Sequence, residues 1–275
     1  LWEKQKMKCG VNWDLSLEGM PMAIYKVTFS PTGGTLKVAD CVAEAFEKDV
    51  VSIDLTDRGF AFAAVRFTSA DLCVVAVPSY GGRAPELAMT RLRQLEGGGA
   101  KAIAIAVYGN RAYEDTLLEL QDALTAGGFH CVAAIAAIAE HSILHQFATG
   151  RPNAVDAKEL AAFAKTVWQR IQAGDIADAC AVAGNKPYRS FGGVPMKPAA
   201  TSACTHCGLC AAKCPAGAIP IDAPSKTNHA TCISCMRCIA ICPNAARKLN
   251  PLVLTIAAQK LKKSCGSARK NEFFV

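Results

Sequence analysis

Two kinds of apolar spacing alternate along much of the chain. Short continuous runs of Val, Ile and Ala are followed by longer stretches in which apolar residues recur every three or four positions. The runs predict strands buried on both faces, and the longer stretches predict helices with one apolar face. The expected strands are 23–29, 50–54, 72–77, 102–108 and 131–138, and the expected helices are 34–48, 85–95, 113–126 and 154–172.

Strands that alternate with helices predict an α/β domain, because helices that connect parallel strands cover both faces of the sheet. We therefore expect a doubly wound, five-stranded parallel sheet in a domain over residues 22–173. Residues 1–21 mix charged residues and tryptophan without a period and are interpreted as an N-terminal extension. The longest apolar stretch, 131–139, is far too short to cross a bilayer, so we expect no membrane span. We also expect no signal peptide and a cytoplasmic location.

The remainder of the chain has a different composition. Residues 174–199 are rich in Gly and Pro and predict a linker, residues 200–250 are rich in Cys, and residues 251–275 form a basic C-terminal tail. Residues 1–183 carry 17 Lys and Arg against 21 Asp and Glu, whereas residues 184–275 carry 13 against 2. Formal charges of −4 and +11 indicate two bodies with opposite surfaces.

Eight of the 14 cysteines form an exact repeat. The pattern C-x-x-C-x-x-C-x-x-x-C-P begins at Cys204 and recurs with identical spacing from Cys232. Three thiolates at this spacing can hold one face of a 4Fe-4S cubane, while the fourth cysteine reaches the other cluster. This spacing assigns cluster I to Cys204, Cys207, Cys210 and Cys242, and cluster II to Cys232, Cys235, Cys238 and Cys214.

Two other interpretations of the cysteines are weaker. Four-thiolate zinc sites also use paired cysteines, but they have no use for a third cysteine at the next step or for the following proline. A disulfide framework is rare in a chain with so large an apolar core. The segment 200–250 resembles the bacterial two-cluster ferredoxins, with every ligand present. That resemblance implies a pseudo-symmetric fold and low-potential one-electron transfer, although the familiar ferredoxins are acidic and this segment is basic.

A second motif follows the first expected strand. The sequence Ser30-Pro31-Thr32-Gly33-Gly34-Thr35 lies where a strand meets a helix N-terminus, so its hydroxyl and amide groups can hold a phosphate. An ordinary capped turn remains the alternative. The motif resembles the flavodoxin FMN-phosphate signature at Ser30, Thr32, Gly33 and Thr35. That resemblance implies a sheet of order 2-1-3-4-5, with FMN at the carboxyl ends of the strands.

Two further loops would then hold the flavin ring. The candidate residues are Pro78, Ser79, Tyr80, Gly81 and Gly82 after the third strand, and Tyr108, Gly109, Asn110, Arg111 and Tyr113 after the fourth. We expect Tyr80 and Tyr113 to stack on the ring and Asn110 to bond its pyrimidine edge. The alternative for each tyrosine is that it packs its own loop. His141, after the fifth strand, either lines this site or caps a helix. No catalytic residue is predicted.

The whole chain from residue 22 resembles flavodoxin-ferredoxin fusion proteins of anaerobic bacteria. The resemblance implies a redox protein with FMN and two 4Fe-4S clusters. One hypothesis is an electron-transfer protein, and the alternative is a flavoenzyme that reduces a small molecule at FMN with electrons fed through the clusters. The basic half predicts an acidic ferredoxin, flavodoxin or reductase as partner, attracted by Lys213, Lys226, Arg237 and Lys248. The dispersed lysines and few aromatic residues argue against nucleic-acid binding.

Overall fold

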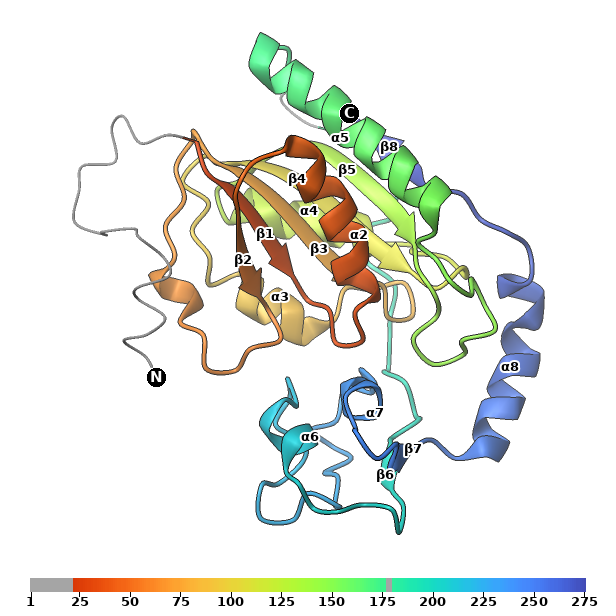
Figure 1. Ribbon diagram of the computed structural model, residues 1–275. Helices are drawn as coiled ribbons and strands as arrows, with labels where there is room; N and C mark the ends of the chain where they lie inside the picture. The colour runs from red at the N-terminus through yellow and green to blue at the C-terminus, as the bar shows by residue number, and fades with distance from the viewer. Residues whose placement is uncertain (1–21, 177–179) are drawn as a thin grey trace.

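The computed structural model describes residues 22–176 and 180–275, so the predicted N-terminal extension lies outside it. Within these residues, six strands form one sheet in the order β2-β1-β3-β4-β5-β8 (Figure 1). The strands are β1 (Ile24–Thr28), β2 (Val50–Asp54), β3 (Leu72–Pro78), β4 (Lys101–Tyr108), β5 (His130–Ile138) and β8 (Glu272–Phe274). The first five are parallel and confirm the predicted order 2-1-3-4-5.

The central strands bury both faces, as their continuous apolar runs predict. In β3, Cys73, Val75 and Val77 face one apolar core while Leu72, Val74 and Ala76 face the other. Helices α3 (Glu86–Leu92) and α4 (Thr116–Ala126) cover the first core. Helices α2 (Gly34–Ala43) and α5 (Ala154–Ala173) cover the second (Figure 1). None of the described helices is long and apolar enough to cross a membrane.

Three of the helices are shorter than the apolar spacing predicts. α2 ends at Ala43 and passes into a short 3-10 helix, Glu44–Phe46. α3 ends at Leu92, three residues before the predicted end. A separate 3-10 turn, Phe62–Ala64, precedes β3. α4 begins only at Thr116, because Glu114 has a φ of 44° that interrupts helical geometry two residues earlier.

The cysteine-rich segment lies beyond the carboxyl ends of the parallel strands (Figure 1). It contains the short helices α6 (Leu209–Ala212) and α7 (Arg237–Ala240), and the pair β6 (Ala199–Ala200) and β7 (Arg247–Lys248) closes it. The buried Arg91 side chain ties it to the sheet domain, since it donates to Leu55 O at 2.6 Å and to Pro215 O at 2.7 Å.

The predicted basic tail has regular structure. Helix α8 (Pro251–Cys265) runs back from the cysteine-rich segment towards the sheet domain, and Cys265 packs with Leu144 and Phe147 of the loop after β5. The chain then adds β8 to the sheet, antiparallel to β5, with Phe273 opposite Ile135. The sheet therefore has one strand more than the five predicted, because the chain end returns to cover an otherwise open edge.

Candidate functional site

Four loops at the carboxyl ends of the strands enclose a cleft. Its lining includes eight of the predicted flavin-site residues: Thr32, Gly34, Thr35, Pro78, Ser79, Tyr80, Tyr108 and Gly109. The loop after β5 adds Ala139, Glu140, His141 and Ser142. Seven predicted residues are not part of the lining: Ser30, Gly33, Gly81, Gly82, Asn110, Arg111 and Tyr113. The cleft lies at the switch point of the strand order, where open α/β sheets bind ligands.

The segment 30–35, which we call the phosphate loop, lies at one side of this cleft. Gly33, at φ 93°, turns the chain from β1 into α2, a conformation that glycine adopts without strain. The Ser30 hydroxyl accepts the Leu36 N–H at 2.8 Å and stabilises the loop. The amides of Gly34 and Thr35 lie in the first turn of α2, where helix geometry leaves N–H groups without an intrahelical acceptor. These amides and the Thr32 and Thr35 hydroxyls fit a phosphate.

Tyr80 forms one wall of the cleft. It opens a tight turn in which Tyr80 and Arg83 exchange backbone hydrogen bonds of 2.8 and 3.2 Å. Gly81 has a φ of 61°, and the ring of Phe191 lies where a side chain on Gly81 would be. Burial raises the pKa of Tyr80 well above its usual range, and the nearby Cys235 adds to the effect. The linker therefore holds the turn that carries this tyrosine.

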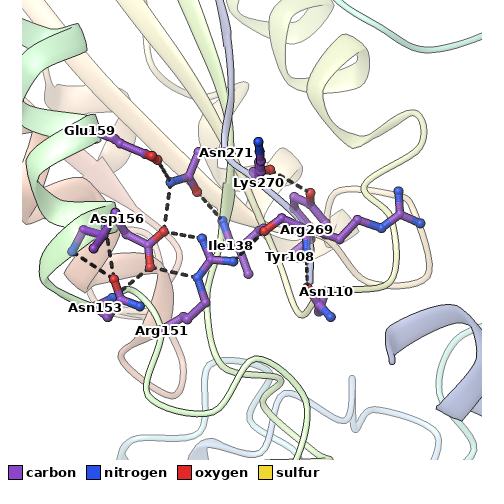
Figure 2. Close-up of polar contacts among 11 residues, drawn as sticks. Tyr108, Asn110, Ile138, Arg151, Asn153, Asp156, Glu159, Arg269, Lys270 and Asn271 are labelled. Atoms are coloured by element: carbon purple, nitrogen blue, oxygen red, sulfur yellow. Dashed lines mark hydrogen bonds and ion pairs between the residues drawn. The ribbon is translucent and has the colours of Figure 1, made fainter. Parts of the chain in front are cut away.

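The other expected flavin loop is bound by the C-terminal segment, residues 266–275 (Figure 2). Asn110 Nδ2 donates to Cys265 O at 2.6 Å and to Ser267 O at 2.9 Å. Its Oδ1 accepts from Arg269 N at 3.2 Å (Figure 2). The Tyr113 hydroxyl donates to Glu272 at 2.7 Å. The Asn110 and Tyr113 side chains thus hold the chain end, and their expected contacts with the flavin stay predictions.

A buried polar network holds the C-terminal segment on the sheet (Figure 2). Asn271 Oδ1 accepts from Ile138 N at 3.1 Å, and its Nδ2 donates to Asp156 at 3.0 Å. Arg151 pairs with the same carboxylate at 2.8 Å and donates to Arg269 O at 2.7 Å. Desolvation would raise the pKa of Asp156, but the hydrogen bonds from Arg151, Asn153 and Asn271 lower it overall. The chain end is therefore a part of the sheet domain.

The two arginines of the flavin loops have structural partners. Arg83 makes two hydrogen bonds with the buried Glu119, at 2.8 and 2.9 Å, and Arg111 pairs with Glu114 at 2.5 Å. His141 accepts the N–H groups of Ile143 and Leu144 at its Nδ1, both at 3.2 Å. It caps a turn, where the sequence offered a helix as one of two alternatives, and it also lines the cleft. Burial lowers its pKa to about 4.

The eight cysteines of the repeat surround two hollows. Cys204, Cys207, Cys210 and Cys242 line one hollow, which we call the cluster I hollow. Cys214, Cys232, Cys235 and Cys238 line the cluster II hollow. Among the described residues, no three His, Cys, Asp or Glu side chains converge closely enough to hold a single metal ion. In both hollows the fourth cysteine comes from the other repeat, as the spacing predicts.

The backbone repeats as closely as the sequence does. His206 and Ser234 have φ values of 57° and 55°, and Gly208 and Met236 have values of 75° and 62°. The N–H groups of Ala218 and Ala246 donate to the sulfurs of Cys214 and Cys242, both at 3.3 Å. Desolvation raises the pKa of the Cys242 thiol, but nearby backbone N–H groups outweigh it and the net shift is downward. In each repeat a backbone N–H group therefore donates to the sulfur of the fourth cysteine.

Two buried side-chain nitrogens lack a partner in the described part of the chain, and both belong to arginines that line the hollows. These atoms are Nε of Arg237 and Nε of Arg247. Arg237 lines the cluster II hollow and Arg247 lines the cluster I hollow. An unpaired buried donor is costly, so an acceptor in each hollow is expected. The sulfur atoms of a 4Fe-4S cluster are such acceptors, and the donor set therefore fits iron-sulfur clusters.

Comparison with protein families agrees with this donor set. Residues 198–247 match the family model described as the 4Fe-4S dicluster domain. The match spans all eight cysteines of the repeat and confirms the 4Fe-4S interpretation over structural zinc. No curated protein matches the chain.

The sheet domain is similar to flavodoxins of known structure. The flavodoxin of Streptococcus pneumonia TIGR4 has 19% identity and a TM-score of 0.39, covering 54% of this chain and 99% of that chain. A flavodoxin from the domain Archaea has 15% identity and a TM-score of 0.41, covering 55% and 99%. Flavodoxin 2 from Bacillus cereus has 15% identity and a TM-score of 0.40, covering 54% and 99%. The strand order of the present structure itself assigns the flavodoxin-like fold.

Proposed function

We propose that this chain is an electron-transfer protein with FMN in the cleft and one 4Fe-4S cluster in each hollow. Thr32, Gly34 and Thr35 would hold the phosphate, and Tyr80 would contact the ring. The two sets of four cysteines would hold the clusters. When bound, the clusters supply one-electron chemistry and the flavin supplies both one- and two-electron chemistry.

The observation that carries this proposal is the contact between the cluster II hollow and the cleft. Arg237, at the start of α7, donates to Ser30 O of the phosphate loop at 3.4 Å. Tyr80, from the cleft wall, and the cluster II ligand Cys232 line one shared cavity of about 370 Å³. A cofactor in either place would thus have the other as its neighbour, which supports electron transfer between them.

The cluster I hollow is the better entry for electrons from outside. Cys207 is exposed, and Leu209, which lines the same hollow, is 39% exposed. Ile221, next to Gly208, is 69% exposed. By contrast, Pro215 beside the cluster II ligand Cys214 is buried against Arg91. These exposures support a path from a partner to cluster I, then cluster II, then the cleft.

The titratable side chains of the cleft favour electron transfer over chemistry on a small molecule. A general acid or base works best when its pKa is near the working pH. The pKa of His141 is lowered to about 4, mainly by burial. The pKa of Glu140 is also lowered, because it accepts hydrogen bonds from Gly150 N–H and His145. Burial raises the pKa of Tyr108 to about 12 and that of Tyr80 well above its usual range.

An acidic redox protein remains our proposed partner, with a smaller docking surface than the sequence indicates. Lys213, Lys226 and Lys248 are exposed and have no ion pair among the described residues. Arg237 is half-buried against the phosphate loop and is not part of that surface. Three exposed lysines on the cysteine-rich segment would attract a ferredoxin, flavodoxin or reductase with an acidic face.

Rapid mixing under anaerobic conditions tests the electron path. We would mix the oxidised protein with a chemically reduced acidic ferredoxin and follow cluster and flavin absorbance. We expect the clusters to be reduced before the flavin, and we expect Cys207→Ala to slow flavin reduction strongly. Flavin reduction at an unchanged rate in Cys207→Ala would contradict the path.

The same assay tests the partner. Exposed charges are screened within about 10 Å at 0.1 M ionic strength, so the association rate should fall steeply with added salt. Replacing Lys213, Lys226 and Lys248 with Glu should slow the reaction at low salt and leave the cluster spectra unchanged. The control is Lys158→Glu, which reverses the charge of one exposed lysine on α5, outside the cysteine-rich segment. A rate independent of salt and of these three lysines would exclude this docking surface.

A further inference from the structure

The two cysteine repeats share a backbone, but two of the side chains that line the hollows differ in charge between the repeats. The repeat offset that relates Cys204 to Cys232 also pairs Leu209 with Arg237 and Ile219 with Arg247. Leu209 and Arg247 line the cluster I hollow, while Ile219 and Arg237 line the cluster II hollow. The second repeat thus carries a guanidinium at each place where the first repeat carries an apolar side chain. Each hollow is therefore lined by one of the two arginines.

Arg247 is a fixed cation inside the cysteine-rich segment. Its residue is 2% exposed. Its Nη1 donates to the Thr227 hydroxyl at 2.6 Å, and its Nη2 donates to the carbonyls of Pro224 and Lys226, the latter at 3.1 Å. These bonds hold the guanidinium plane in one orientation and leave the buried Nε–H without a protein partner. Arginine stays charged in such a place.

Arg237 occupies the matching place in the other hollow. One end of its guanidinium, Nη1, reaches Ser30 O at 3.4 Å. Its Nε is buried without a protein partner, as in Arg247. The side chain lies between the cluster II hollow and the phosphate loop, and it comes from the first residue of α7.

We propose that Arg247 and Arg237 set the reduction potentials of the two clusters separately, each by donating its Nε–H to a sulfur in its own hollow. The inference rests on the proposed presence of a cluster in each hollow. It assigns the two arginines a positioning and tuning role toward the clusters, and it assigns them no part in ligation.

The direction of the effect follows from charge. Reduction adds one electron to a cluster and makes it more negative, so a nearby cation and an N–H donor both stabilise the reduced form. Charge and hydrogen bonds to sulfur are among the factors that set cluster potentials. Removing either arginine should therefore lower the potential of its own cluster and make that cluster harder to reduce. Arg247 also bonds the hydroxyl of Thr227, which lines the cluster II hollow. Removing Arg247 should therefore lower the potential of cluster II as well, but by less, because the Arg237 donor remains there.

Potentiometric titration monitored by electron paramagnetic resonance tests the proposal. The variants are Arg247→Ile and Arg237→Leu, which introduce the residues that the first repeat carries at the same places. We expect the reduced-to-oxidised ratio at a fixed potential to fall about tenfold for one cluster in each variant, which corresponds to about 59 mV for one electron. Arg247→Ile should shift the cluster I signal, and Arg237→Leu should shift the cluster II signal. Cys207→Ser identifies the cluster I signal by changing one of its ligands.

Charge-matched controls separate the buried donors from general electrostatics. Lys248→Met removes a positive charge one residue from Arg247, and Lys213→Met removes one beside Cys214, but both lysines are exposed. We expect these variants to shift the potentials much less than the arginine variants. Equal shifts from the lysine and arginine variants, or no shift from any, would overturn the proposal. A protein that holds no clusters would instead contradict the proposed function itself.

A third pair of variants covers the case in which Arg247→Ile does not fold, since it removes three hydrogen bonds. Arg247→Lys and Arg237→Lys keep the charge but lack an Nε–H. If the hydrogen bond contributes, each should still lower the potential of its own cluster. Wild-type potentials in both lysine variants would show that the Nε–H groups do not act on the clusters.

Discussion

The two domains of this protein are stabilised in different ways. The sheet domain buries both faces of its central strands, and Ile105 of β4 and Leu117 of α4 are fully buried. The apolar cluster of the cysteine-rich segment is small and contains Cys210, Ala211 and Ile219, together with the partly buried Cys238. Two of these four residues are predicted cluster ligands. The sheet domain is therefore stable through apolar packing, whereas the cysteine-rich segment depends on what its cysteines bind.

The largest expected difference between the domains follows removal of iron. Chelation under reducing conditions should unfold residues 200–250, because this segment lacks an apolar core of sufficient size, and should leave the sheet domain folded. Limited proteolysis with mass spectrometry would locate the cleavage sites. We expect new sites between residues 200 and 250 and a resistant fragment that contains β1 to β5. A cysteine-rich segment that stays resistant without iron would contradict the comparison.

Changing one ligand should give a smaller, local effect. Cys242→Ala should damage cluster I while cluster II persists, because Cys242 lines the hollow of Cys204, Cys207 and Cys210. We expect about half of the iron to be lost, as each cluster holds four irons. Cys214→Ala is the matched variant and should damage cluster II instead. Loss of the cluster bound by Cys232 in the Cys242→Ala protein would exclude the crossed arrangement.

A core substitution in the sheet domain should have the opposite pattern. Ile105→Ala removes a fully buried side chain and should lower the free energy of unfolding of the sheet domain by roughly 2–5 kcal/mol. The iron content should not change, since β4 does not contribute to either hollow. Thermal unfolding followed by far-UV circular dichroism, together with iron analysis, measures both effects. A fall in iron that matches the fall in stability would show that the two domains fold as one unit.

The smallest expected effect concerns the C-terminal segment. Tyr113→Phe removes the hydrogen bond to Glu272 and should destabilise the docked segment by about 1 kcal/mol. Hydrogen exchange of the β8 amides would report this change as faster exchange. Tyr108→Phe is the control, because its hydroxyl is 3.4 Å from Lys270 O and makes a weaker bond. Equal protection of β8 in wild type and Tyr113→Phe would show that this bond does not hold the segment.

Most of the architecture could be predicted from the sequence because its signals are local. Continuous apolar runs predict β1 to β5, and the spacing from Cys204 to Cys242 predicts two groups of four cysteines. The strand β8 could not be predicted in this way. It is a short strand, and it exists because the C-terminal segment finds β5, which lies far earlier in the chain. Pairing between such distant segments leaves no periodic signal.

The roles of individual side chains at the site were harder to predict. Asn110 and Tyr113 follow β4 as flavin-contacting residues would, yet their partners Ser267 and Glu272 come from the chain end. A loop sequence does not reveal which distant segment reaches it. The basic composition predicts Arg237 as a surface charge, but comparison of the two cysteine repeats indicates a different environment. At the equivalent position of the first repeat, the chain carries a leucine that faces a hollow.

The cofactor content of the purified protein tests the central claim most directly. Anaerobic purification followed by acid extraction should give about one FMN, eight irons and eight acid-labile sulfides per chain, as two four-iron clusters require. The Cys242→Ala protein should retain its FMN while its iron falls. Stoichiometric zinc, FAD in place of FMN, or about four irons per chain in the wild-type protein would contradict the account.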